Sequence, residues 1–540
     1  MANHSEEQRE DTWIAKRRRV QNLEDLEDLD DGPRFQTLEK LPDELLLHIL
    51  DSTGSLESPT LSFSAICLVS RRFNRVATPF LYATMEREFP CAEVEENCSL
   101  ARYLRTLQAR PKFRLLTRTL LQTLPSKERV CTCDVHGRSL MRDLADELDL
   151  SGQSFVRERS ARMEDYLMSL CAFLAPNLER LETRLTDAIW DTKQEGLLLE
   201  YISQSALGIP VGNVHSFDKL RFLHVEPGGT FTVPNRHALP LVLLPKLKHL
   251  ALGDWGSVDD YDENTGEYTG MIDLNDSEVF GRPWTWPMRS SPISELSLLS
   301  PRTTPQLACQ MIIACKTLKK FKCTTTWRFV RPGDGKWYTH ITSALHAHCD
   351  TLQELHIRED FTGIRECNQG RVHSLARMVS LTHLRIPWGL LYSHGRGTLC
   401  STLPRSLEYL VIELGSPGIE QLMASLEELH REMDTYFPVL KHVHVLWALW
   451  MFSTPFVPHI TKAKYLFEHS SVRFDATIVF TDIRAPSPDE MRQYEAVFTA
   501  SARYVDEWGQ HRGSSHHVTK ASTCVSDPEE FEDLMVGYIR

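Results

Sequence analysis

Three short stretches of the chain hold residue types that could bind a metal ion or a phosphate. Cys131, Cys133 and His136 are zinc-type ligands, but a structural zinc site needs four ligands and no second pair follows at the usual spacing. The acidic stretch 259–270 carries alternating acids, yet Gly266 falls one place late for a calcium loop, and Met271 stands where a bidentate glutamate belongs. Residues 331–336, RPGDGK, lack the spacing of a phosphate loop. The sequence therefore predicts no metal site and no cofactor.

The chain also lacks the local motifs of the common catalytic sites. It contains no nucleophile elbow, no HExxH pair and no CxxC pair, and isolated Cys, His and Asp residues are expected by chance at this length. We therefore predict a binding protein and not an enzyme. An enzyme built on an α/β repeat is a distant alternative.

Composition narrows the possible partners and compartments. The chain has 540 residues, 42% of them apolar, and a formal net charge of -13, which argues against a nucleic-acid partner. No run approaches the ~18 uncharged apolar residues of a spanning helix, so no membrane partner is expected. The N-terminus is polar and acidic, unlike a secretory signal, and the cysteines are scattered. These features predict a cytoplasmic or nuclear protein with reduced thiols.

Residues 1–37 hold two opposed charge blocks. Lys16–Arg19 is a short basic cluster of the kind that nuclear import receptors bind, and Glu24–Asp31 is acidic. We predict a disordered leader here, with a nuclear localisation signal as the alternative.

The stretch 38–84 has the pattern of a small helical unit. Leu41-Pro42 precedes Asp43-Glu44, which places a proline and two acids where a first helical turn favours them. Apolar residues then recur at helical spacing up to Leu50 and again between Ile66 and Val76, and Pro79 is expected to end the second pattern. So short and apolar a unit is expected to complete its burial against a partner.

Leu41-Pro42 at the start is followed by Ile49-Leu50, by the run LVSRRF at 68–73 and by the closing Leu81-Tyr82. With these residues the stretch resembles an F-box, with a lengthened connection at 51–60; an ordinary helical hairpin within a larger domain is the alternative. The resemblance implies docking onto a Skp-family adaptor and, through it, onto a cullin-RING ubiquitin ligase. The residues that carry it, together with their apolar neighbours, are the expected adaptor contacts: Leu41, Pro42, Glu44, Leu45, Ile49, Leu50, Leu68, Val69, Ser70, Arg72, Phe73 and Leu81.

A repeat follows a stretch, 85–165, that we predict to be a helical linker. The pattern apolar-x-x-apolar-x-apolar occurs at 220–225, 247–252, 293–298, 318–323, 352–357, 381–386, 407–412 and 440–445. Helical patterns such as Pro305–Cys315 and Ile419–Met433 lie between copies. Each copy is expected to supply one strand and one return, and neighbours are expected to stack into a common core.

The repeat resembles the divergent, fungal-type leucine-rich repeats that occur in F-box proteins, from about Asn177 to Phe480. The position at which that family places Asn or Cys is occupied by other residues, so a regular amide ladder is not expected. The predicted fold is α/β: a helical F-box unit, then an irregular leucine-rich-repeat solenoid over 166–485. A C-terminal helix and tail over 486–540, opened by the cap at Ser487–Glu490, would close the stack. A generic α/β domain is the alternative.

Residues between the core leucines of each predicted strand should line an inner face. The basic and histidine residues among them form the expected substrate surface: His224, His249, Lys320, Lys322, His356, His383, Arg385, His442 and His444. We expect this face to be neutral to basic, to gain charge as pH falls toward ~6.5, and to receive an acidic or phosphorylated segment of an unknown protein substrate. The alternative is that exposed strand positions simply accept polar residues.

Four tryptophans follow the strands: Trp255, Trp327, Trp388 and Trp447. They are expected along one rim, either as interface anchors or packed under the turns. Together the resemblances imply the substrate-recognition subunit of an SCF-type (Skp, cullin, F-box) ubiquitin ligase. The alternative is an adaptor-binding F-box scaffold that acts outside any ligase.

Overall fold

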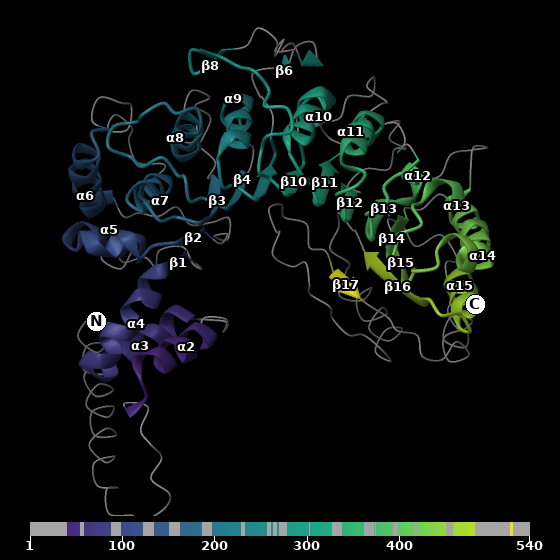
Figure 1. The fold of residues 1–540 in the computed structure, drawn as a ribbon, viewed down its shortest axis with the longest axis horizontal. Helices are drawn as coiled ribbons and strands as arrows, with labels where there is room; N and C mark the ends of the chain where they lie inside the picture. Colours follow the sequence, from purple (N-terminus) through teal and green to yellow (C-terminus); the bar gives the residue numbers. More distant parts are fainter. Residues whose placement is uncertain are drawn as a thin grey trace, which may run out of the picture. The chain divides into compact units, whose positions relative to one another are not determined.

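The structure is a computed structural model that divides into two compact units, Met1–Leu81 and Tyr82–Arg540 (Figure 1). It describes residues 40–53, 59–87, 99–122, 134–150, 163–185, 197–227, 233–255, 261–262, 267–268, 278–301, 303–326, 337–360, 372, 374–391, 398–414, 418–449, 457–480 and 519–521. Within these ranges, no helix is both long enough and apolar enough to span a membrane. The predicted leader at 1–37 and the helix expected from Ser487 lie outside the described residues.

The described part of the first unit is helical: α2 (Asp43–Thr53), α3 (Pro59–Val69) and α4 (Arg71–Ala83). Helix α2 begins as predicted, because the Pro42 carbonyl accepts the first backbone bonds and Asp43 lies in the first turn. Ser70 separates α3 from α4, and its Oγ accepts a hydrogen bond from the Phe73 N–H at 3.3 Å.

Two expectations about α4 are wrong. Leu68 and Val69 do not continue the apolar face of Phe73 and Val76, because Ser70 starts a new helix between them. Pro79 does not end the pattern, since α4 continues to Ala83. A proline removes one backbone donor, and the packing of Phe80 and Leu81 against the core of the unit offsets that loss.

The first unit has a small core of its own. Leu46 and Leu50 of α2 pack with Phe63 of α3 and with Phe73, Val76 and Ala77 of α4. The rings of Phe63 and Phe80 lie 5.5 Å apart, which adds an aromatic contact. The three helices therefore bury one apolar face without help from another element.

The second unit is built on one 13-stranded sheet whose strand order follows the chain order. Neighbouring strands run parallel from β1 to β16, and β17 is antiparallel to β16. The strands are β1 (Thr84–Arg87), β2 (Thr119–Gln122), β3 (Arg180–Leu185), β4 (Phe222–Pro227), β5 (His249–Gly253), β10 (Glu295–Leu299), β11 (Lys320–Thr326), β12 (Glu354–Asp360), β13 (His383–Pro387), β14 (Tyr409–Leu414), β15 (His442–Leu449), β16 (Arg473–Phe480) and β17 (Thr519–Ala521). The prediction of an α/β fold is confirmed at this level, and each predicted repeat strand is a strand.

Helices and short turns connect these strands (Figure 1). They are α5 (Ser99–Ala109), η4 (Pro111–Leu115), α6 (Asp134–Glu147), α7 (Met163–Phe173), α8 (Leu197–Ala206), α9 (Asn235–Ala238), η6 (Leu239–Leu243), α10 (Pro305–Ala314), α11 (Trp337–Leu345), η8 (His346–His348), α12 (Trp388–Leu391), α13 (Leu399–Thr402), α14 (Ile419–Tyr436) and α15 (Val457–Phe467). Two short hairpins, β6 (Tyr261–Asp262) with β7 (Glu267–Tyr268) and β8 (Glu278–Val279) with β9 (Arg282–Pro283), lie in the insertion after β5. The predicted returns at Pro305 and Ile419 are confirmed as α10 and α14.

The sheet begins earlier than the repeat pattern predicted. Strand β1 begins at Thr84 and β2 ends at Gln122, so both fall at the start of the stretch 85–165 that was expected to be a helical linker. Each contributes only four residues and one buried apolar side chain, Met85 or Leu120. So short an alternation carries too little periodicity to predict a strand.

Candidate interaction surfaces

The first unit exposes large apolar side chains although its own core is complete. Leu45, Leu47 and Ile49 of α2 are 50%, 40% and 40% exposed, and Leu68 and Val69 at the end of α3 are 87% and 65% exposed. We call these five residues the exposed apolar set. Helix α2 is apolar on both sides, because Leu46 and Leu50 face the core while the residues one place earlier face solvent. Five large exposed apolar side chains on one small unit make this set a candidate interaction surface.

The Asp43 carboxylate connects the start of α2 to α4 through ion pairs. Asp43 accepts hydrogen bonds from Arg72 at 2.7 Å and from Arg75 at 2.6 Å, and Arg72 also donates to the Leu41 carbonyl. The hydrogen bond from Arg72 and the charges of both arginines hold the pKa of Asp43 below its usual range. These bonds fix the orientation of α2, and through it the orientation of Leu45, Leu47 and Ile49.

The predicted adaptor contacts separate into three groups. Pro42, Glu44, Leu45, Ile49, Leu68 and Val69 are exposed, whereas Leu41, Ser70, Arg72 and Leu81 are half-buried and Leu50 and Phe73 are core residues. Leu47 was missed. The run of three leucines at 45–47 was the signal, because three successive helical positions cannot all face one side.

The register of the sheet brings the predicted substrate residues together on one face. Phe222, His249, Glu295, Lys320, Glu354, His383, Tyr409 and His442 are Cα partners along one row. His224, Ala251, Ser297, Lys322, His356, Arg385, Val411 and His444 form the next row. We call these two rows the open face, since the intervening leucines are buried on the opposite side.

The open face carries carboxylates that pair with its basic groups. Lys320 lies 3.0 Å from Glu354, and His249 lies 3.1 Å from Glu295. Arg385 donates to Glu413 at 2.5 Å, and both side chains are largely removed from solvent, with 17% and 3% exposed. The face was expected to be neutral to basic, and these pairs place it toward the neutral end of that expectation.

The acids that were missed lie beyond the two predicted rows. Glu413 follows Val411 by two residues on β14, and Asp475 lies on β16, where it accepts from His442 at 2.9 Å and Arg473 at 2.8 Å. The period-two pattern of a strand could have placed Glu413 on this face.

Aromatic rings and a guanidinium group also stack along the first row of the open face. The Arg180 guanidinium lies over the Phe222 ring at 4.0 Å, and Phe222 stacks on His249 at 4.2 Å. His383 stacks on Tyr409 at 4.4 Å. Neighbouring side chains of the first row therefore satisfy one another, as cross-strand pairs do.

Burial affects three histidines of the open face: His249, His356 and His444. The pKa of His356 and of His444 is lowered to about 4, mainly by burial and also by nearby basic groups. Burial also lowers the pKa of His249, although Glu295 opposes the shift. The rings of His356 and His444 stay neutral as pH approaches 6.5, so the predicted gain of positive charge fails at these two positions.

The tryptophans favour the packing interpretation where they are described. Trp255 and Trp388 are buried, at 0% and 3% exposure, so they form no exposed rim. Trp327 and the Trp447 side chain lie outside the described residues, as do Cys131 and Cys133. Across the ranges that the structure describes, no group of His, Cys, Asp or Glu residues could hold a metal ion.

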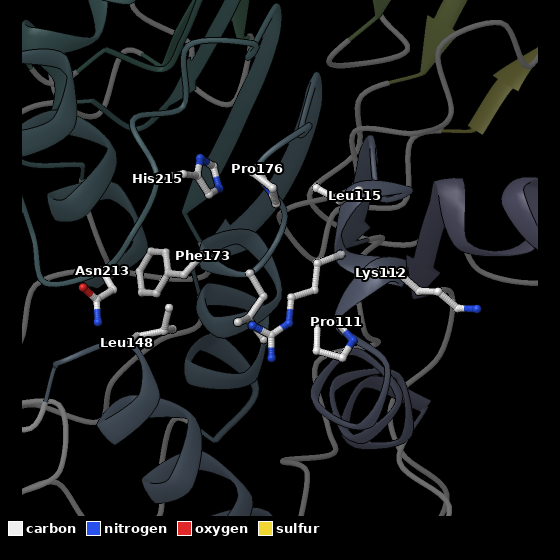
Figure 2. A pocket seen from close by; sticks show the side chains of 10 residues that line it. Pro111, Lys112, Leu115, Leu148, Phe173, Pro176, Asn213 and His215 are labelled. Carbon is white, nitrogen blue, oxygen red and sulfur yellow. The ribbon is translucent and has the colours of Figure 1, made fainter.

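An open hollow of about 410 Å³ is lined by residues of η4, of the segments at the ends of α6 and α7, and of the segment before β4 (Figure 2). Leu115, Leu148 and Phe173 contribute to its apolar lining, and Figure 2 shows His215 at the same hollow. The His215 ring is held by the Ala172 carbonyl at 2.9 Å and the Phe217 N–H at 3.1 Å, and burial lowers its pKa. Because both ring nitrogens bond to backbone groups, this histidine serves the local fold.

No model of a known protein family matches the chain, and a comparison with curated proteins finds no match.

Proposed function

We propose that this protein is the substrate-recognition subunit of an SCF-type ubiquitin ligase. In this proposal the first unit is an F-box that docks a Skp-family adaptor, and the second presents a protein substrate. The observation that carries the proposal is the exposed apolar set on a unit whose own core is already complete.

The adaptor surface follows from burial and charge. Burying a leucine side chain contributes about 1.5–3 kcal/mol, and Leu68 and Val69 retain most of that potential because they are 87% and 65% exposed. The Asp43 bonds hold α2 in place, so a partner meets an ordered surface. The occupant is an adaptor with a matching apolar groove.

The second unit supports the substrate role through its topology. Parallel strands that follow chain order, in continuous register from β3 to β16, are what a leucine-rich-repeat solenoid requires. Such a solenoid provides a long ordered surface for a protein ligand. Ubiquitin transfer then speeds up because the receptor raises the local concentration of substrate lysines beside the loaded conjugating enzyme. These partners act in the cytoplasm or the nucleus.

Co-purification of the full-length chain with an adaptor and a cullin tests the proposal. We expect L68D/V69D to lose both partners, because each aspartate would be buried without a partner in the docked state. The matched control is L115D/V379D, which alters two exposed apolar residues of the second unit, 57% and 62% exposed. Both variants should retain the far-ultraviolet circular dichroism of the wild type.

The outcomes separate the proposal from its competitor. Recovery of an adaptor without a cullin would favour the scaffold. Failure of the wild-type chain to capture any Skp-family adaptor would contradict both.

A further inference from the structure

The edge at which the strands begin carries a second ordered surface. The Arg221 carbonyl accepts from the N–H groups of Lys248 at 2.8 Å and His249 at 3.0 Å. The Lys248 carbonyl accepts from Ser294 at 2.9 Å, and the Ser294 carbonyl accepts from Lys319 at 2.8 Å. This backbone ladder aligns the residues that precede β4, β5, β10 and β11 along one edge of the sheet.

The turns on this edge concentrate positive charge. Residues 218–221, 245–248, 288–294 and 316–319 contain seven basic residues and one acid, Asp218, in a chain whose net charge is -13. All seven basic residues are exposed, and we call them the basic edge: Lys219, Arg221, Lys246, Lys248, Arg289, Lys316 and Lys319. Glu179, before β3, lies 3.9 Å from Arg221, and Asn177 accepts a hydrogen bond from Lys219.

The corresponding turns further along the sheet are balanced. Residues 350–353, 379–382, 405–408 and 438–441 lead into β12 to β15 and contain two basic residues, Arg405 and Lys441, and two acids, Asp350 and Glu408. Lys441 bonds to Glu408 at 2.5 Å. The same structural position is thus neutral in one half of the sheet and strongly basic in the other, so the repeat architecture alone does not account for the charge.

An exposed methionine lies within the basic edge. Met288 is 68% exposed, and the next residue, Arg289, adopts a left-handed φ of 49° that is unusual for a residue with a side chain. Backbone hydrogen bonds hold the turn against the end of α10. The Arg289 N–H donates to the Ile313 carbonyl at 3.1 Å, and the Lys316 N–H donates to the Ser291 carbonyl at 2.9 Å. An ordered backbone therefore presents an adaptable apolar side chain among the basic groups.

We propose that the basic edge binds an acidic segment of a protein partner, with an apolar side chain of that segment packed on Met288. In the proposed ligase this segment belongs to the substrate, and that identification rests on the proposed function. The binding itself depends only on the second unit.

Two observations favour this occupant and this location. The four turns contain no aromatic residue, so they lack the stacking platforms that single-stranded nucleic acids use. On the open face, by contrast, Lys320 and Arg385 already pair with carboxylates at 3.0 Å and 2.5 Å. An acidic peptide would compete with those pairs there, but would meet mainly solvated lysines at the basic edge.

Fluorescence anisotropy on the full-length chain tests the proposal. The probe is a labelled synthetic peptide of alternating glutamate and serine with one central leucine, and a second probe carries glycine in place of that leucine. The test variant is K246E/K248E/K316E/K319E. The matched control is R105E/R142E/R377E/R431E, which changes net charge equally at exposed positions elsewhere. Should the test variant fail to fold by circular dichroism, the same four lysines are changed to glutamine.

We expect the test variant to weaken binding of the leucine probe by about tenfold or more and the control to weaken it by less than about threefold. M288S should weaken the leucine probe and leave the glycine probe unchanged. Equal losses of affinity in the test and control variants would overturn the proposal, because binding would then depend only on the net charge of the chain. Loss confined to K320Q/K322Q/R385Q would overturn it by moving the site to the open face.

Single-stranded oligodeoxythymidylate of matched charge serves as the competing ligand. If the oligonucleotide bound more tightly than the peptide probes and lost this binding in the test variant, the proposal of a protein partner would be overturned. Adaptor capture through Leu68 and Val69 is measured separately, so a negative peptide result does not affect it, and failed adaptor capture leaves the peptide result standing.

Discussion

Two surfaces of the molecule differ in what their side chains contact: the exposed apolar set on α2 and α3, and the open face of the sheet. The first leaves apolar groups such as Leu68 in solvent beside a finished core. The second pairs its charges internally, as Arg385 does with Glu413 and His442 does with Asp475. A surface that still gains free energy by burial favours a partner, whereas a self-paired surface mainly stabilises its own sheet. The identity of surface residues therefore says less about binding than what those residues already contact.

Helix α2 offers the sharpest test of this contrast, because successive residues belong to different surfaces. We expect Leu46→Ala to destabilise the first unit by about 2–5 kcal/mol, since the side chain is 2% exposed and its loss leaves a cavity. Leu45→Ala should cost less than about 0.5 kcal/mol, because that side chain is half exposed. Hydrogen exchange of the α2 amides in the full-length chain measures both changes. Similar protection losses in the two variants would show that the exposed apolar set is part of the core.

The ion pairs of the open face give the second test. We expect Glu413→Ala to lower the free energy of unfolding by about 2–3 kcal/mol, because it leaves the Arg385 guanidinium mostly buried without its carboxylate. Glu354→Ala should cost less than about 1 kcal/mol, since its partner Lys320 is 37% exposed. Urea unfolding followed by circular dichroism compares them. The double variant R385M/E413L should recover much of the loss; if it is as unstable as E413A, packing and not charge dominates at this position.

The sequence predicted the parts of the fold that depend on repeated patterns. The triads ending at Val225 and Val445 became buried strand residues in one register, because period-two alternation reports directly on which side faces the core. The N-terminal proline and acids of α2 likewise predicted a helix start that the structure has. Short elements such as β1 escaped, since one buried residue, Met85, makes no pattern.

The candidate surfaces were harder to predict because they depend on neighbours in space. Sequence placed Arg385 correctly on the open face, but the carboxylate that pairs with it comes from the next strand, at Glu413. The basic edge escaped for a related reason. Its members, such as Lys248 and Lys319, lie in the turns that precede the strands, and each turn contains only one or two basic residues. Their concentration becomes visible only once strands far apart in the chain are aligned by the backbone ladder.

Acidification should produce a small but specific loss of stability at the self-paired open face. His356 and His444 take up a proton near pH 6.5 when unfolded but only near 4 in the folded protein. Between those values the unfolded chain binds more protons, so stability rises with pH and is lost as pH falls from 6.5 toward 4. We expect a loss of roughly 1–2 kcal/mol for each histidine, after discounting for the part of each ring that faces solvent.

Urea unfolding at a series of pH values measures that loss, and H356Q/H444Q should flatten the profile in this window while leaving stability above pH 7 little changed. A profile that is equally steep in the variant would mean that other groups titrate here.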